Sequence, residues 1–72
     1  MNNNITIKVR ERYYEVEEYV IDKRTLIGIE RDYYNDELIL EKGIDLTDEG
    51  FETVDQFIRA LVRLDYELVY VK

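Results

Sequence analysis

Carboxylates are the side chains of this sequence whose type and spacing could do chemistry, since its 72 residues include 17 Asp and Glu but no His and no Cys. They are unevenly placed, because residues 32–58 hold nine of them against a single basic residue, Lys42. The nine are Asp32, Asp36, Glu37, Glu41, Asp45, Asp48, Glu49, Glu52 and Asp55. The net charge of −7 therefore resides in this acidic segment, which should repel nucleic acid and membranes and attract cationic partners.

Carboxylates gathered in one segment predict binding rather than catalysis. We expect a non-catalytic acidic protein whose acidic segment docks on a basic surface of a protein partner. Same-face side chains of a strand lie about 6–7 Å apart, so rows of carboxylates would approximate the charge density of a nucleic-acid backbone. The partner's basic surface would then be a nucleic-acid site. The alternative is that the acidic residues only keep a small protein soluble.

The composition supports this hypothesis in general terms. In composition, though in no motif, the chain resembles the small acidic single-domain inhibitors that phages and mobile elements make against restriction, CRISPR or host DNA enzymes. That resemblance implies an inhibitor that acts as a DNA mimic. An apolar content of 46% is too high for a disordered segment, and residues 1–72 are expected to form one domain. No targeting signal or membrane-spanning stretch is apparent, so we expect a cytoplasmic location.

One stretch is similar to the opening of a calcium-binding loop. Residues 45–50 begin with Asp45 and place Gly50 at the sixth position. Continuing the register puts Glu52 where an apolar residue belongs and Gln56 where a bidentate Glu is required. We therefore expect no metal and no cofactor, and we interpret the stretch as a loop that leads into a helix.

The sequence contains no catalytic constellation, so we do not expect an enzyme. Its seven Tyr include two adjacent pairs, but a paired-Tyr nicking enzyme would need a metal held largely by His. Tyr is a favoured half-buried residue of strands. The three glycines, Gly28, Gly43 and Gly50, are too scattered for a phosphate-binding loop. No nucleophile and base occur at a sequence spacing that is typical of a catalytic pair.

A basic and aromatic strand face offers two other functions. Lys8, Arg10 and Arg12 alternate along one strand, which is typical of sheets that hold single-stranded nucleic acid. Neighbouring glutamates and the negative net charge oppose this, so we expect no direct nucleic-acid partner. The other function is self-association, as a homodimer, through the face of the sheet that the helix leaves open. The contact residues would be Lys8, Arg10, Tyr19, Ile39, Leu68 and Tyr70.

Alternating apolar and polar residues predict a β-hairpin over residues 5–20. We expect Val9 to lie opposite Val16 on the apolar face. Lys8 would then lie opposite Glu17 on the other face, and opposite charges across strands contribute roughly 0.2–1 kcal/mol. Charge therefore favours this register over a slip by one residue.

Glu18 is the exception in this register, because it falls on the apolar face. It would lie at a sheet end open to water, at a local bulge, or in an ion pair with Arg31. A general acid or base in an apolar pocket would need a second catalytic group, and none is apparent.

Two further strands are expected before the helix. The first covers residues 25–31 and places Gly28 beside Tyr19, since a strand Gly often lies beneath a cross-strand aromatic ring. Residues 34–37 form the strongest turn signal, because Asn and Asp tolerate positive φ. The second strand then covers residues 38–42 and ends at Gly43.

The helix is the clearest element of the sequence. Thr53 followed by Gln56 matches a capping box, and apolar residues recur at helical spacing over residues 54–64. A last strand is expected over residues 66–72. Four meandering strands, a helix and a strand are most simply arranged as an antiparallel sheet of order 5-1-2-3-4 with the helix on one face, a two-layer α+β fold.

Overall fold

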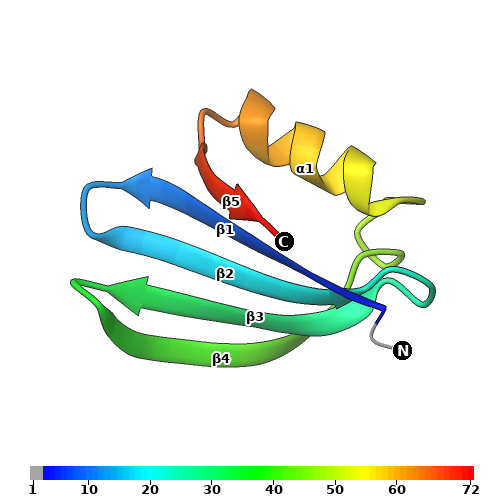
Figure 1. Cartoon of the computed structure of the whole chain (residues 1–72), viewed down its shortest axis with the longest axis horizontal. Coiled ribbons are helices and arrows are strands. Elements are labelled where there is room, and N and C mark those ends of the chain that lie inside the picture. Colours follow the sequence, from blue (N-terminus) through cyan, green and yellow to red (C-terminus); the bar gives the residue numbers. More distant parts are fainter. Residues whose placement is uncertain (1–2) are drawn as a thin grey trace.

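The computed structural model describes residues 3–72, which form an antiparallel sheet with one helix on one face (Figure 1). The elements are β1 (Asn4–Arg12), β2 (Glu15–Asp22), β3 (Ile27–Tyr34), β4 (Glu37–Asp45), α1 (Val54–Arg63) and β5 (Glu67–Val71). The sheet order is β4-β3-β2-β1-β5, with antiparallel neighbours throughout. The predicted α+β class, element order and strand order are all confirmed.

The hydrophobic core lies between α1 and the central strands. Its buried residues are Ile7, Val9, Tyr19, Ile21, Leu26, Leu46, Phe57 and Leu61. Phe57 and Leu61 lie one helical turn apart, so both face the sheet. The ring of Phe57 packs edge-on against Tyr19, with 4.9 Å between ring centroids, and against Phe51 at 5.4 Å. These contacts hold α1 on the sheet.

The predicted β1–β2 register is wrong by one residue. Val9 lies opposite Glu17 instead of Val16, and a register shift between Arg10 and Arg12 lies next to the turn. Such a shift accommodates one extra residue in β1. Because successive side chains of a strand point to opposite faces, the slip turns the side chains of β2 to the faces opposite those expected.

Burial explains why the observed register is preferred. It places Tyr19 and Ile21 on the face that α1 covers, where they are 5% and 0% exposed. Burying an Ile side chain contributes about 1.5–3 kcal/mol, whereas a cross-strand ion pair contributes roughly 0.2–1 kcal/mol. The core therefore overrides the pairing of Lys8 with Glu17.

The predicted neighbour of Gly28 is also wrong. Gly28 lies opposite Ile21, not beside Tyr19. The backbones approach so closely there that a Cβ on Gly28 would lie 2.0 Å from the carbonyl oxygen of Val20. Gly28 is therefore required for close contact between β2 and β3 rather than for space beneath an aromatic ring.

The β3–β4 hairpin forms around the predicted turn but is longer than expected. Asn35 and Asp36 have φ angles of 51° and 66°, as a tight turn between two strands requires. β3 ends three residues beyond the predicted 25–31, and β4 continues through Gly43 instead of ending there. The result is a nine-residue strand at one edge of the sheet.

Thr53 is the predicted N-cap of α1, but the reciprocal hydrogen bond of Gln56 is made with Glu52 instead of with Thr53. The hydroxyl oxygen of Thr53 accepts a hydrogen bond from the Gln56 backbone N–H at 3.1 Å, and the Gln56 side chain accepts one from the Glu52 N–H at 2.8 Å. Two N–H groups at the helix start are thereby satisfied. Within residues 3–72, no helix has the length and apolar character that crossing a membrane requires.

Candidate functional site

The structure does not gather the nine carboxylates of the acidic segment into one continuous surface. Asp36 and Glu37 lie at the β3–β4 turn, and five others lie where β4 ends and α1 begins. Asp45, Asp48, Glu49, Glu52 and Asp55 make up that second group. The nine residues of β4 separate the two groups by about 26 Å, from a rise of about 3.3 Å per residue. Asp32 and Glu41 point to opposite faces, so no row with phosphate-like spacing forms.

Asp45, Asp48, Glu49 and Glu52 form the acidic end of the molecule. The carboxylate of Asp45 accepts hydrogen bonds from the Thr47 N–H at 3.0 Å and the Thr47 hydroxyl at 2.6 Å, which fixes the turn after β4. Across residues 3–72, no basic side chain lies within 4 Å of these four carboxylates. Asp55, by contrast, pairs with Arg59 at 3.2 Å. The acidic end therefore carries uncompensated negative charge.

A separate cluster of three carboxylates, from β2 and β3, lies on the helix-covered side of the sheet, beyond the core. Oxygens of Glu17, Glu30 and Asp32 lie within 4.8 Å of one another. The amino group of Lys42 lies 3.9 Å from Glu30. One Asp32 oxygen is buried and makes no hydrogen bond within the described residues. Three carboxylate oxygens at this spacing are, among residues 3–72, the groups best placed to hold a cation or share a proton.

Burial shifts the titration of this group. It raises the pKa of Glu30 to about 7, with further contributions from a hydrogen bond and charge repulsion from Asp32. Burial also raises the pKa of Glu17, although the hydroxyl of Tyr19, which donates a hydrogen bond to Glu17, works in the opposite direction. The group therefore retains part of a proton at neutral pH.

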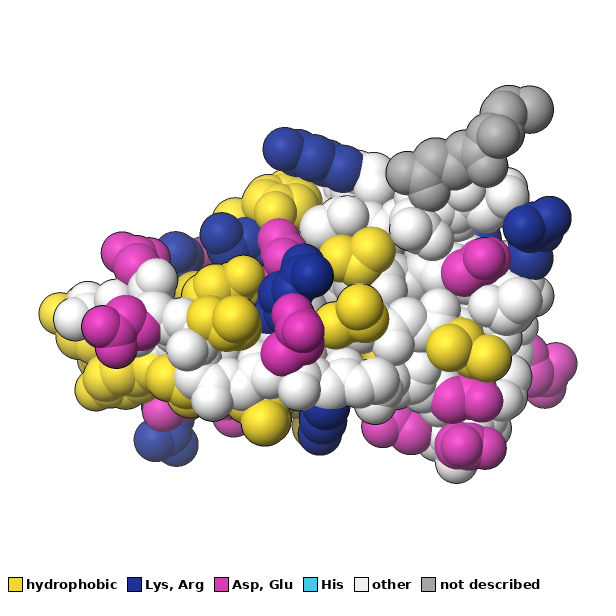
Figure 2. Space-filling model, turned by 90° about the horizontal axis from the view of Figure 1, so that it is seen from below, with side chains coloured by type: hydrophobic (Ala, Val, Ile, Leu, Met, Phe, Trp, Pro, Cys, Tyr) yellow, Lys and Arg dark blue, Asp and Glu magenta, His cyan; other side chains and the backbone are white. Residues whose placement is uncertain are grey.

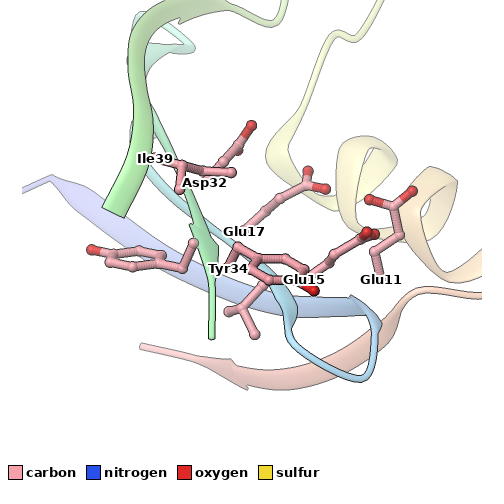
Figure 3. Close-up of a pocket in the computed structure, with 8 residues that line it drawn as sticks. Glu11, Glu15, Glu17, Asp32, Tyr34 and Ile39 are labelled. Atoms are coloured by element: carbon pink, nitrogen blue, oxygen red, sulfur yellow. The ribbon is translucent and has the colours of Figure 1, made fainter. Parts of the chain in front are cut away.

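A cavity of about 160 Å³ opens beside these carboxylates and is called here the acidic pocket (Figure 3). Its lining comprises Glu11, Glu15, Val16, Glu17, Asp32, Tyr33, Tyr34 and Ile39. β1, β2 and β3 each contribute acidic groups, while Ile39 comes from β4. Among residues 3–72, none of the four lining carboxylates has a basic side chain within 4 Å.

Most of the acidic pocket was not predicted from the sequence. Asp32 was selected, but the slipped β1–β2 register placed Glu17 opposite Lys8 on the uncovered face, whereas the structure places both Glu17 and Asp32 on the helix-covered face. The signal that could have found the pocket is Tyr19 followed by Ile21, a pair of large apolar residues at strand spacing. Placing this pair in the core turns Glu17 to the same side.

On the opposite, uncovered face, carboxylates are neutralised by a basic residue. Arg31 lies 3.5 Å from Glu18 and 2.6 Å from Glu41, and the hydroxyl of Tyr70 donates to Glu18 at 3.1 Å. Of the three alternatives for Glu18, the structure shows the ion pair with Arg31, and it lies on this face instead of the helix-covered one. Because Glu41 is already paired, it offers less charge to a partner than its position suggested. Figure 2, seen from the β4 side, shows hydrophobic side chains interspersed with charges of both signs.

The predicted self-association contact is divided between the two faces. Lys8, Arg10 and Tyr70 share the uncovered face. Tyr19 is buried in the core, and Leu68 lies opposite the buried Val9, so neither belongs to that face. The inclusion of these two residues was wrong, because it followed from the slipped β2 register and from a register shift between β1 and β5 at Lys8. Ile39, 64% exposed, lies at a register shift in β4.

Two of the three basic residues proposed for single-stranded nucleic acid, Lys8 and Arg10, contact other side chains. Arg10 pairs with Glu67 at 2.6 Å, and the amino groups of Lys8 and Lys72 lie 5.8 and 4.5 Å from the centre of the Tyr70 ring. A base could not stack on the face of Tyr70 that a lysine covers without displacing it.

The chain matches no protein-family model, no curated protein and no solved structure. Its function is therefore argued from its own residues.

Proposed function

We propose that the protein is a non-catalytic binding protein that docks on a basic surface of a protein partner. One observation carries the proposal: carboxylates without a basic neighbour in residues 3–72 stand at both ends of β4, in the acidic end and around the acidic pocket. Charge of one sign at two separated places can orient a partner as well as attract it.

The positive charges of the chain do not offset these carboxylates. Arg10, Arg31 and Arg59 pair with Glu67, Glu41 and Asp55, and Lys42 pairs with Glu30, which lies beside the acidic pocket but not in its lining. The acidic end and the acidic pocket therefore remain available to cationic groups from outside. Such unpaired surface carboxylates increase the association rate of a cationic partner and make its affinity depend on salt concentration.

The basic surface of the partner is proposed to be one that binds nucleic acid. Carboxylates can engage the Lys and Arg side chains that otherwise contact phosphates, and docking would then exclude DNA or RNA. The protein would act as an inhibitor, a role that needs negative charge but no continuous copy of the phosphate spacing. A partner of this kind would place the encounter in the cytoplasm.

The proposal is tested by isolating a partner and measuring its affinity. The immobilised protein is used to retain partners from a cell extract at low salt, and the retained protein is purified and titrated by calorimetry with and without duplex DNA. We expect a partner with a basic surface, and we expect DNA to compete with binding. Retention of neutral partners only, or of none, would contradict the proposal.

Matched double variants then locate the docking surface, since each removes two negative charges. They are Asp48→Asn with Glu49→Gln at the acidic end, Glu11→Gln with Glu15→Gln at the acidic pocket, and Asp55→Asn with Glu67→Gln as the control. The control carboxylates already have arginine partners. We expect the first two variants to weaken binding about tenfold and the control about twofold or less. An equal effect of all three would mean that only net charge matters.

A further inference from the structure

β4 forms an open edge of the sheet. It pairs with β3 on one side and is the last strand in the sheet order on the other (Figure 1). It has nine residues, whereas the opposite edge, β5, has five. Residues 37–43 are all exposed. An edge strand of this length presents a row of unpaired N–H and C=O groups to which another strand can add.

Exposed apolar side chains lie along this backbone. Leu38, Ile39 and Leu40 follow one another and are 51%, 64% and 45% exposed. The register shift opposite Tyr33 interrupts the pairing near Ile39, but from Leu40 to Asp45 β4 pairs with β3 without a break. The apolar strip therefore adjoins the regular part of the edge at Leu40, and the regular part itself has no Pro, a residue that commonly blocks the pairing of edge strands.

Carboxylates lie at both ends of the same edge. Ile39 is part of the wall of the acidic pocket (Figure 3), and Asp45 begins the acidic end. The amino group of Lys42, the basic residue of β4, lies 3.9 Å from a carboxylate oxygen of Glu30, so its charge is already engaged in an ion pair. A strand laid along β4 would meet negative charge at each end and apolar side chains near Leu38 and Leu40.

We propose that the β4 edge binds an extended, basic segment of a protein partner as an added strand of the sheet. This inference rests on the proposed function, because it describes how the basic partner docks. Backbone hydrogen bonds along β4 would supply affinity. Lys or Arg side chains opposite the acidic pocket and the acidic end would supply specificity.

A second copy of the chain fits this edge less well. Each copy carries a net charge of −7. Two β4 strands paired antiparallel about Glu41 would place Glu41 opposite Glu41 and Glu37 opposite Asp45. Like charges directly across a strand pair are destabilising. The charge pattern therefore favours a cationic strand as the occupant.

Synthetic peptides test the added strand directly. The probe is a fluorescent peptide of about eight residues in which Lys and Val alternate, and its binding is followed by anisotropy at low salt. Two further versions carry backbone N-methyl groups, one at the odd and one at the even positions. Because only alternate N–H groups of an added strand face its neighbour, one methylated version should bind about tenfold more weakly than the other. Equal binding of all three peptides would overturn the inference.

Two lysine substitutions test the location. Ile39→Lys and Leu64→Lys each add one positive charge at side chains that are 64% and 67% exposed, and NMR spectra report whether the variants are folded. We expect Ile39→Lys to weaken peptide binding about fivefold and Leu64→Lys, at the end of α1, to change it less than about twofold. Equal effects would contradict a site on β4.

The outcomes separate this inference from the proposed function. If peptide affinity depends on salt but is unchanged by N-methylation and by Ile39→Lys, the β4 edge is not the binding site. The proposed function would still hold. Absence of binding to any cationic peptide and to any basic partner would overturn both. Sedimentation that shows a dimer disrupted by Ile39→Lys would assign the edge to a second copy and so contradict the inference.

Discussion

The hydroxyl of Tyr19 donates a hydrogen bond to the carboxylate of Glu17, which joins the hydrophobic core to the acidic pocket. The ring of Tyr19 is 5% exposed and packs edge-on against Phe57 of α1. Glu17 belongs to the carboxylate group with Glu30 and Asp32. A single side chain thus has its apolar part in the core and its polar end in the pocket, as is common for buried Tyr.

Removing this hydroxyl should destabilise the fold. Tyr19→Phe leaves the half-buried Glu17 without its donor, and we expect the free energy of unfolding to fall by about 1–2 kcal/mol. Tyr70→Phe is the matched control, because Glu18 keeps Arg31 when it loses the hydroxyl of Tyr70, and a loss within about 0.5 kcal/mol is expected. Urea denaturation measures both. Equal losses of unfolding free energy in the two variants would show that the hydrogen bond from Tyr19 to Glu17 stabilises the fold no more than the one from Tyr70 to Glu18.

Stability should decrease as pH rises through neutrality. The pKa of Glu30 is raised from 4.5 to about 7 by burial, so its contribution is complete below about pH 4.5 and is lost as pH passes about 7. The carboxyl keeps some solvent contact, so we expect a loss of only about 1–2 kcal/mol between about pH 5 and about pH 8.5.

Glu30→Gln tests this pH dependence, because it keeps the shape of the side chain and removes its titration. The variant should be more stable than the native chain at pH 8.5, with a flatter profile of unfolding free energy against pH. Glu37→Gln, which removes one carboxylate at an exposed position, serves as the control and should change the free energy of unfolding at pH 8.5 by less than about 0.5 kcal/mol. A native profile that rises from pH 5 to pH 8.5 would contradict the sign of the shift.

Gly28 and Gly43 should respond differently to the same substitution. A Cβ at Gly28 would lie 2.0 Å from the Val20 carbonyl oxygen, whereas the nearest atom to a Cβ at Gly43 would be 3.9 Å away. We expect Gly28→Ala to destabilise by about 2–3 kcal/mol and Gly43→Ala to change stability by less than about 0.5 kcal/mol. Thermal unfolding of the two variants compares them. A tolerated Ala at residue 28 would mean that β2 and β3 are less closely packed there.

The helix cap offers a local test of the fold. Thr53→Ala removes the acceptor for the Gln56 N–H, and a loss of about 1 kcal/mol is expected. Thr53→Ser keeps the acceptor and should restore most of that stability. Failure of Ser to restore it would show that the methyl group of Thr53, rather than its hydroxyl, matters.

Local chemistry made much of this fold predictable from the sequence. The capping box begins α1, positive φ is tolerated at Asn35 and Asp36, and strand alternation marks β1. These signals act between residues close in sequence. Together with the rule that connections between elements are short, they were sufficient for the strand order.

Register and the acidic pocket were not predictable in the same way. The register of β2 depends on burying Tyr19 and Ile21 against α1, which is distant in sequence, while the local signal was the attraction of Lys8 for Glu17. The register shift between Arg10 and Arg12 carries no Gly or Asn that would mark it. Because a one-residue slip exchanges the faces of β2, this single error also hid the acidic pocket.

The decisive measurement is the change in partner affinity with salt concentration. Unpaired carboxylates at both ends of β4 predict that the affinity for the purified basic partner falls by about tenfold or more between about 50 mM and about 200 mM salt. Neutralising Asp48 with Glu49, or Glu11 with Glu15, should reduce the steepness of that fall. An affinity that stays constant across this range, in the native chain and in both variants, would contradict docking through these carboxylates.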